Sequence, residues 1–175
     1  MENTRLSNHF TLEEFINSKK YPDNKPTLQV VANMIYGCLM LLEPASEAIG
    51  CPIIINSGFR NPRVNTLVGG VKNSQHLLGQ AADIRPKDPA QFHRLVAFLR
   101  NCEYTDQLLT GSGWLHISWS PFTPPRHFVR IGYYKPHTGM SLCEVRYPIQ
   151  GLASHHAEQA LIHCLIYYDT LNGMV

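Results

Sequence analysis

The chain has 175 residues, of which 44% are hydrophobic and 16% are charged. This length and composition suit a single folded domain with a real hydrophobic core, and they differ from those of disordered chains. The net charge of +2, with no cluster of Lys and Arg, argues against nucleic acid as a partner. The sequence does not indicate the oligomeric state.

The cysteines and the N-terminus bear on where the protein is made. The five cysteines are widely spaced and form no CxxC pair, which argues against a sulfur-ligated zinc and favours reduced, mostly buried thiols. Residues 1–10 contain no apolar stretch of the kind found in a secretory signal. No apolar run approaches the roughly 20 residues of a membrane-spanning helix. We therefore expect a protein made in the cytoplasm, without a signal peptide or a transmembrane segment.

The first third of the chain predicts two helices and one strand. The sequence TLEE at 11–14 is a capping box, which predicts a short helix through about Ser18. Apolar residues recur at helical spacing from 27 to 50, which predicts a long core helix that Pro44 kinks or divides. The β-branched run at 53–55 predicts a short buried strand.

The middle of the chain continues to alternate helices with strands. Asp88, followed by a proline, is typical of a helix start and predicts a helix to about Asn101. Together these patterns indicate an α+β fold, with a small antiparallel sheet flanked by helices. The remaining predicted elements are a short helix over 61–70, a strand over 82–85, a hairpin of 106–109 with 114–119, and a last strand over 128–134.

The character of the sequence changes after about residue 134. Residues 135–151 contain Pro and Gly and show little periodicity, whereas Ser154 to Leu171 has apolar residues on one helical side. We therefore expect one domain over residues 1–134, and a C-terminal extension over 135–175 that is partly helical and has no assigned role.

Three side chains in glycine-punctuated segments form a candidate metal site. His76, Asp83 and His116 offer two imidazoles and one carboxylate. Two histidines and a carboxylate are a known ligand set for Zn²⁺ that leaves a fourth position open, and such a zinc can polarise a carbonyl and activate water. The sequence therefore predicts a Zn²⁺-dependent hydrolase.

The order of several motifs resembles one family of enzymes. The motif Ser74-x-His76-x-x-Gly79-x-Ala81-x-Asp83, followed by WLHIS at 114–118, is similar to the M15 zinc peptidases, which include D-Ala-D-Ala carboxypeptidases and phage endolysin peptidases. The blocks LSNHFTLEEF, SGFRNPRVN and DQLL match in the same order, so the resemblance covers about residues 6–133. It implies a Hedgehog/DD-peptidase-like fold and His76, Asp83 and His116 as zinc ligands.

Two further residues match the family pattern. Arg60, in SGFR, corresponds to the arginine that faces the substrate, where a guanidinium can bind a peptide carboxylate or stabilise an oxyanion. Its alternative role is a structural salt bridge. Ser74 belongs to the same motif, and it either binds substrate or holds the loop.

The general base is the gap in this pattern. M15 enzymes carry an acid shortly before the last histidine ligand, but the residue three positions before His116 is Gly113, and residues 110–115 contain no acid. The nearest candidates to accept a proton are Asp106 and, as the weaker of the two, Glu103. An alternative role for Asp106 is to orient a ligand imidazole.

Two functions follow from these expectations. The leading hypothesis is a zinc peptidase, of carboxypeptidase or endopeptidase type, that cleaves peptidoglycan stem peptides near a D-amino acid. The resemblance extends it to a phage-encoded enzyme that acts on the cell wall after release. The alternative is a catalytically silent domain that binds zinc and cell-wall peptide, or a structural module, because the expected acid is missing.

Overall fold

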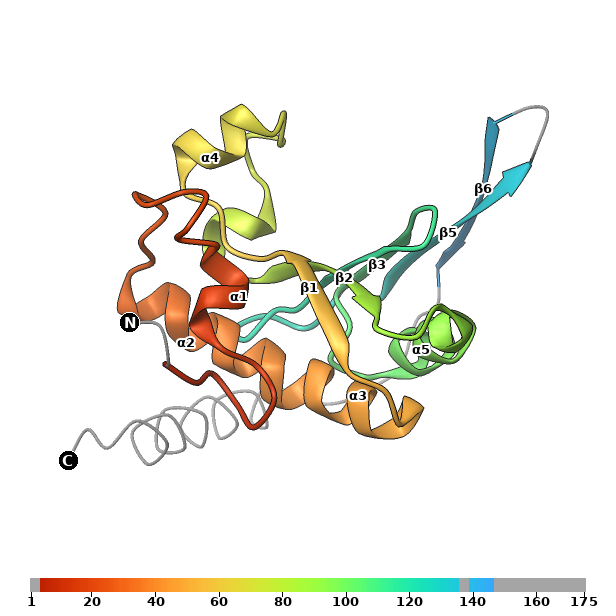
Figure 1. Ribbon diagram of the computed structural model, residues 1–175. Helices are drawn as coiled ribbons and strands as arrows, with labels where there is room; N and C mark the ends of the chain where they lie inside the picture. Colours follow the sequence, from red (N-terminus) through yellow and green to blue (C-terminus); the bar gives the residue numbers. More distant parts are fainter. Residues whose placement is uncertain (1–3, 136–138, 147–175) are drawn as a thin grey trace.

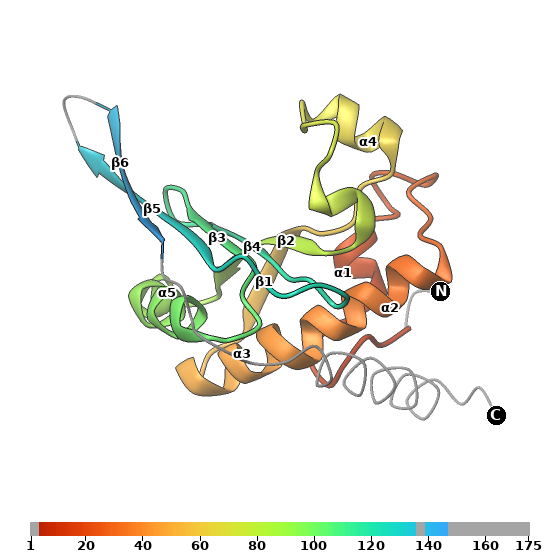
Figure 2. The same cartoon turned by 180° about the vertical axis from the view of Figure 1, so that it is seen from behind.

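A six-stranded sheet organises the part of the chain that the computed structural model describes, residues 4–135 and 139–146. Its strand order is β1-β2-β4-β3-β5-β6 (Figures 1 and 2). Four of the five neighbouring pairs are antiparallel, and β3 pairs with β5 in parallel. The bounds of the strands are Ile53–Ser57 (β1), Ala81–Pro86 (β2), Gln107–Thr110 (β3), Leu115–Ser118 (β4), Phe128–Lys135 (β5) and Gly139–Arg146 (β6).

The α+β prediction is confirmed, but the sheet is not wholly antiparallel. The segment after β4 crosses over before β5 begins, so β5 lies beside β3 and runs in the same direction. A short hairpin gives an antiparallel neighbour, whereas a parallel neighbour needs a longer crossover. The crossover here contains Pro124 and Pro125.

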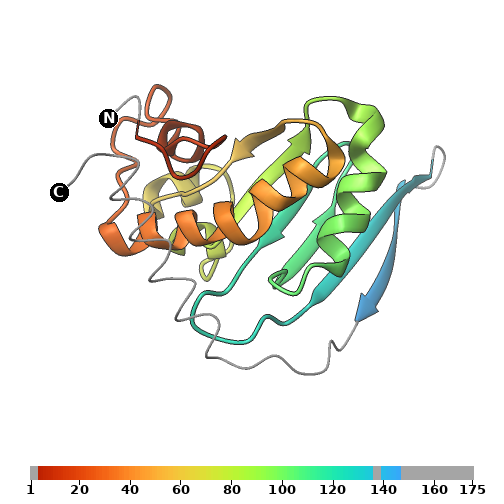
Figure 3. The same cartoon turned by 90° about the horizontal axis from the view of Figure 1, so that it is seen from below.

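Helices cover one face of this sheet (Figure 3). The long helical segment and α5 lie across the same face, and their apolar residues form the core with alternate residues of the strands. One such core row crosses the sheet from Ala82 to Ile117 to Leu108 to Val129. The helix bounds are Leu12–Ile16 (α1), Leu28–Gly37 (α2), Glu43–Ile49 (α3), Pro62–Leu67 (α4) and Phe92–Asn101 (α5), with 3₁₀ turns at Gln75–Leu78 and Pro89–Gln91.

The predicted long helix is present, and Pro44 changes its winding without breaking it. A π-helical turn, Cys38–Leu42, joins α2 to α3. Proline has no amide hydrogen to continue the ladder of hydrogen bonds, and the amide of Glu43 donates to the carbonyl of Cys38, five residues earlier. The segment ends at Gly50, whose backbone is left-handed.

This helical segment bears on the prediction that the chain has no apolar run long enough to span a membrane. Leu28–Ile49 is 22 residues long and apolar enough to span a membrane by length and composition alone, which was not expected. However, 67% of its apolar window is buried inside the protein, as in the core helix of a soluble domain. The segment therefore does not show a membrane span.

The other predicted elements form with small shifts in their bounds. The capping box at Thr11 and Glu14 is present, but α1 ends at Ile16, because Asn17 is left-handed. The last predicted strand continues to Lys135 and pairs with β6, which the sequence analysis did not expect (Figure 2). The expected helix over 154–171 lies outside the described residues.

Candidate metal centre

The three predicted ligands meet on the face of the sheet opposite the helices. Side chains alternate between the faces of a strand, so the residues beside the core row point the other way. Asp83 of β2 pairs with His116 of β4, and both belong to this second row. A register shift between Ile55 and Ser57 brings Ser57 opposite Asp83 and starts the loop that carries Arg60.

The 3₁₀ turn Gln75–Leu78 supplies the third ligand, His76. The turn ends at Gly79, which has φ +65° and therefore adopts a left-handed conformation that favours glycine. The His76 side chain is only 3% exposed, and its Nδ1 lies 2.6 Å from the carbonyl oxygen of Gly58. Because a carbonyl only accepts, Nδ1 carries the hydrogen and Nε2 presents its lone pair to the site.

The donor atoms of the three residues converge. His76, Asp83 and His116 each offer one ligand atom, and these atoms lie within 4.8 Å of one another. Oδ1 of Asp83 lies 2.9 Å from Nδ1 of His116 and 3.3 Å from Nε2 of His76, and the two imidazole nitrogens are 3.3 Å apart. Two neutral imidazole nitrogens and a carboxylate oxygen at one point are the donor set that Zn²⁺ prefers, so these residues fit the ion.

Arg60 binds the second oxygen of the Asp83 carboxylate. Its Nη2 donates to Oδ2 at 2.5 Å, and its Nε donates to the Ser57 hydroxyl at 2.9 Å. Burial raises the pKa of Asp83, but the contacts of Oδ1 with His116 and His76 outweigh that effect and hold the pKa far below its usual range. The carboxylate is therefore ionised and oriented, with Oδ1 toward the imidazoles and Oδ2 toward Arg60.

A cleft of about 750 Å³ opens over the three ligands. Arg60 and Ser74 line it, and Trp114 and Val71 contribute exposed apolar surface. Among the described residues that line the cleft, the acids are Asp83 and Asp106.

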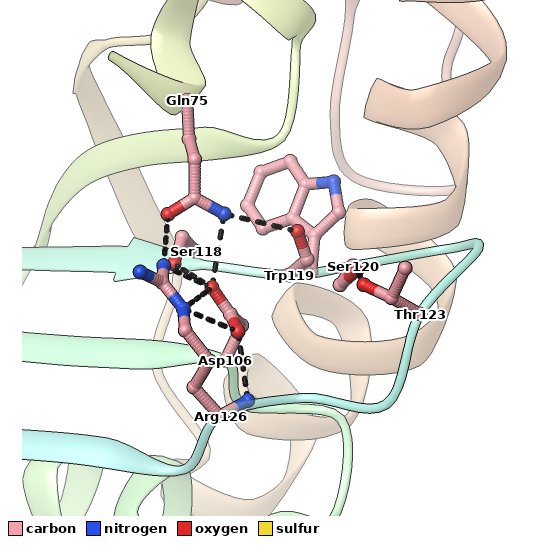
Figure 4. A network of polar contacts seen from close by, with 7 residues as sticks. All are labelled: Gln75, Asp106, Ser118, Trp119, Ser120, Thr123 and Arg126. Atoms are coloured by element: carbon pink, nitrogen blue, oxygen red, sulfur yellow. Dashed lines mark hydrogen bonds and ion pairs between the residues drawn. The ribbon is translucent and has the colours of Figure 1, made fainter. Parts of the chain in front are cut away.

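The contacts of Asp106 argue against its interpretation as the general base. Both of its oxygens accept hydrogen bonds from Arg126, and Oδ2 also accepts from Gln75 and Ser118 (Figure 4). Burial raises the pKa of Asp106, but these hydrogen bonds, led by that of Arg126, lower it below its usual value. A buried carboxylate with saturated acceptors and a lowered pKa is a poor proton acceptor.

The alternative role for Asp106, orienting a ligand imidazole, is not seen either. His76 directs Nδ1 to the carbonyl of Gly58, and His116 directs Nδ1 to Asp83, so within the described residues Asp106 bonds to neither ring. Gln75 and Arg126, which hold Asp106, were not predicted from the sequence. Gln75 is adjacent to a ligand in the motif, but Arg126 follows a proline-rich connector and carries no local signal.

The donor atoms of the site fit a metal ion, and comparison with known proteins gives the family. The sequence model of the family described as Peptidase M15 matches residues 8–118, which include all three ligands. The chain therefore belongs to the M15 peptidase family.

One curated relative shows how far the likeness extends. A zinc D-Ala-D-Ala carboxypeptidase of Streptomyces albus G is 40% identical to this chain over 60 residues. The match covers 34% of this chain and 23% of the relative, so the chain spans about a quarter of the length of that protein. Zn²⁺, named in the relative, is the ion that the His76, Asp83 and His116 group fits.

Proposed function

We propose that the protein is a zinc peptidase that hydrolyses peptide bonds in peptidoglycan stem peptides near a D-amino acid. The observation that carries this proposal is the convergence of His76 Nε2, Asp83 Oδ1 and His116 Nδ1 beneath an open cleft. When bound there, Zn²⁺ supplies a Lewis acid for a substrate carbonyl and lowers the pKa of a coordinated water. The substrate class comes from the name of the relative.

The protein's own residues prepare the centre for this reaction. The Gly58 carbonyl fixes the tautomer of His76, and Arg60 holds one oxygen of Asp83 so that the other faces the imidazoles. The main role proposed for Arg60 is therefore to orient Asp83. Arg60 would contact the substrate only with those N–H donors that face the cleft. Ser74 lines the cleft next to the His76 turn, where its hydroxyl can hydrogen-bond to a substrate backbone.

A catalytically silent binding domain is the second candidate. The observation in its favour is that both acids lining the cleft are already engaged: Asp83 belongs to the ligand group, and Asp106 is saturated by Arg126 and its neighbours. No acid of the β3–β4 loop replaces them, because that loop is GSGW at 111–114. Hydrolysis would then lack a group that accepts the proton.

Zinc content and muropeptide cleavage, measured on the same sample, test these candidates. The peptidase proposal expects one zinc per chain, with cleavage of a D-Ala-D-Ala carboxypeptidase or an endopeptidase substrate. His116→Ala should lose both. The control His93→Ala removes an exposed histidine of α5 and should lose neither.

The outcomes separate the hypotheses. Stoichiometric zinc without cleavage of either type of substrate would favour the binding domain. Absence of zinc from the wild type would overturn the assignment of the ligands and, with it, both candidates.

A further inference from the structure

The cleft contains a second arginine–carboxylate pair that the metal centre does not use. Asp106 precedes β3 and Arg126 precedes β5, and they are joined by several hydrogen bonds (Figure 4). Oδ1 accepts from the backbone amide and Nε of Arg126 at 2.8 and 2.9 Å, and Oδ2 accepts from Nη2 at 2.5 Å. The guanidinium therefore has a fixed position and a fixed plane.

The two partners differ in their exposure to the cleft. The Asp106 side chain is 3% exposed, whereas that of Arg126 is 57% exposed, and both line the cleft. The hydrogen bonds of the Arg126 guanidinium that involve described residues use Nε and Nη2, which leaves Nη1 as a donor for a ligand. Arg60, the other guanidinium of the cleft, is only 15% exposed and is bound to Asp83.

The negative charge of Asp106 is also shared among several donors. Gln75 donates to it at 2.9 Å and Ser118 at 3.1 Å, in addition to the bonds from Arg126. Since the carboxylate is buried behind these groups, the guanidinium is the part of the pair that is exposed at the cleft. A planar guanidinium with free donors is suited to a carboxylate ligand.

The pair lies close to the metal centre along the sheet. Ser118, which donates to Asp106, follows His116 by two residues on the same strand and the same face. Two strand residues correspond to about 7 Å, which is also the length of about two residues of an extended peptide. A carboxylate bound at Arg126 would therefore belong to a residue near the bond at the metal centre, because both groups line the same cleft.

We propose that Arg126, held in place by Asp106, determines specificity by binding a carboxylate of the peptide substrate. Asp106 acts through Arg126 and is a positioning residue. The carboxylate comes either from the C-terminus of the peptide or from an acidic side chain near the cleaved bond. This inference rests on the proposed function for its substrate class, but it concerns binding, which can be measured without turnover.

The test compares peptides that differ only in their carboxylates. Zinc-loaded wild type and Arg126→Gln are titrated by calorimetry with a peptide ending in D-Ala-D-Ala as the free acid, with its C-terminal amide, and with a C-terminally amidated peptide that carries one glutamyl side chain. We expect Arg126→Gln to weaken binding of one acidic peptide about 10- to 100-fold. Binding of the uncharged amide should change less than about twofold.

Matched variants separate recognition from folding. Arg126→Lys keeps the charge but loses the planar fork, so it should recover only part of the affinity. Asp106→Asn should weaken binding of the same acidic peptide and, where the peptide is cleaved, raise KM more than it lowers kcat. Arg63→Gln, which removes an exposed arginine of α4 paired with Asp23, should change neither.

Each outcome decides the proposal. A loss confined to the free acid assigns the C-terminal carboxylate, and a loss confined to the glutamyl peptide assigns the side chain. Equal losses for acids and amide, unchanged binding in Arg126→Gln, or no binding of either acid to the wild type would overturn the proposal. If no peptide is cleaved but the Arg126-dependent preference persists, the inference holds and the peptidase proposal fails.

Discussion

Arg60 donates to the oxygen of Asp83 that faces away from the imidazoles, at a distance of 2.5 Å from Nη2 to Oδ2. Arg60 therefore orients the Asp83 carboxylate through the oxygen that does not face the imidazoles. The carbonyl of Gly58 orients the His76 ring in the same way, through Nδ1. Groups that orient metal ligands contribute to metal affinity even though they do not touch the metal. This contact gives Arg60 a role that its sequence motif alone did not distinguish from substrate binding.

Replacing Arg60 should weaken zinc binding. In Arg60→Gln the Asp83 carboxylate loses its charged partner and can rotate, so we expect zinc affinity to fall about 10- to 100-fold. Competition with a chromophoric chelator measures the change. Arg63→Gln is the control, because Arg63 pairs with Asp23 on the exposed surface. Wild-type zinc affinity in Arg60→Gln would show that the pair has no orienting role.

The left-handed glycine that ends the His76 turn is a second point of sensitivity. Gly79 has φ +65°, and a Cβ placed there would lie 2.6 Å from the backbone oxygen of Val30. Gly79→Ala combines backbone strain with a clash against α2, so we expect it to lower the free energy of unfolding by about 2 to 3 kcal/mol and to weaken zinc binding. Denaturant titration and chelator competition measure the two effects.

Gly69 provides a matched control for this substitution. It has φ +71°, but nothing lies within 4 Å of a Cβ built on it. Gly69→Ala should therefore cost only the left-handed backbone, about 1 kcal/mol, and leave zinc affinity unchanged. Equal losses in the free energy of unfolding for the two variants would mean that the clash with Val30 does not lower the stability.

The sequence predicted local features of this fold better than long-range ones. Capping at Thr11, the apolar periodicity of 28–49 and the hairpin turn at 111–114 are encoded by neighbouring residues, and all are present. The parallel pairing of β3 with β5 and the pairing of β6 with β5 depend on which strands lie side by side. A local periodic pattern does not predict which strand will be the partner of another. The π-helical turn before Pro44 was expected only as a kink or a break.

The candidate site shows the same division. His76, Asp83 and His116 are joined by a recognisable motif order, and the fold brings their donor atoms together. The partners of Asp106 come from a 3₁₀ turn, from β4 and from the segment before β5, so no local pattern could reveal that this carboxylate is saturated. For the same reason the sequence offered Asp106 as a base, whereas in the structure both of its oxygens accept hydrogen bonds from neighbouring side chains.

Removing the Asp106 charge should destabilise the fold without removing the metal. Asp106→Asn replaces an acceptor-only group by one that presents its own N–H to the donors of Arg126, Gln75 and Ser118, so we expect a loss of about 2 kcal/mol in the free energy of unfolding. Zinc affinity should remain within about threefold of wild type, because Asp106 bonds to none of the ligands in the described structure. Denaturant unfolding and zinc titration test both parts.

The pH dependence of this loss follows from the lowered pKa of Asp106. A carboxyl whose pKa is lower in the folded state than its ordinary value of 3.8 contributes stability that is present above that value and is lost as the pH falls through the folded pKa. The stability difference between wild type and Asp106→Asn should therefore be largest near neutral pH and shrink below about pH 4. A difference that stays constant on acidification would contradict the assignment.

The stability contributed by the pair of His9 and Glu43 should be lost as the pH rises, whereas that contributed by Asp106 is lost as the pH falls. Nδ1 of His9 lies 2.6 Å from Oε2 of Glu43, and this hydrogen bond and the charge of Glu43 raise the pKa of His9 above 6.5. A raised histidine pKa contributes stability that is fully present below the unfolded pKa and is lost as the pH rises through the folded pKa. The stability difference between wild type and His9→Asn should therefore be largest near about pH 5.5 and decline by about pH 8.5.

Denaturant unfolding across that range measures the effect, and Glu43 stays ionised throughout it because its pKa is lowered by His9 and Ser7 despite its burial. The His9 side chain is largely exposed, so solvent screening keeps the contribution small. His93→Asn is the control, since His93 is exposed on α5 and belongs to none of the ion pairs among the described residues. A difference for His9→Asn that grows toward alkaline pH would reverse the sign and exclude the charged pair.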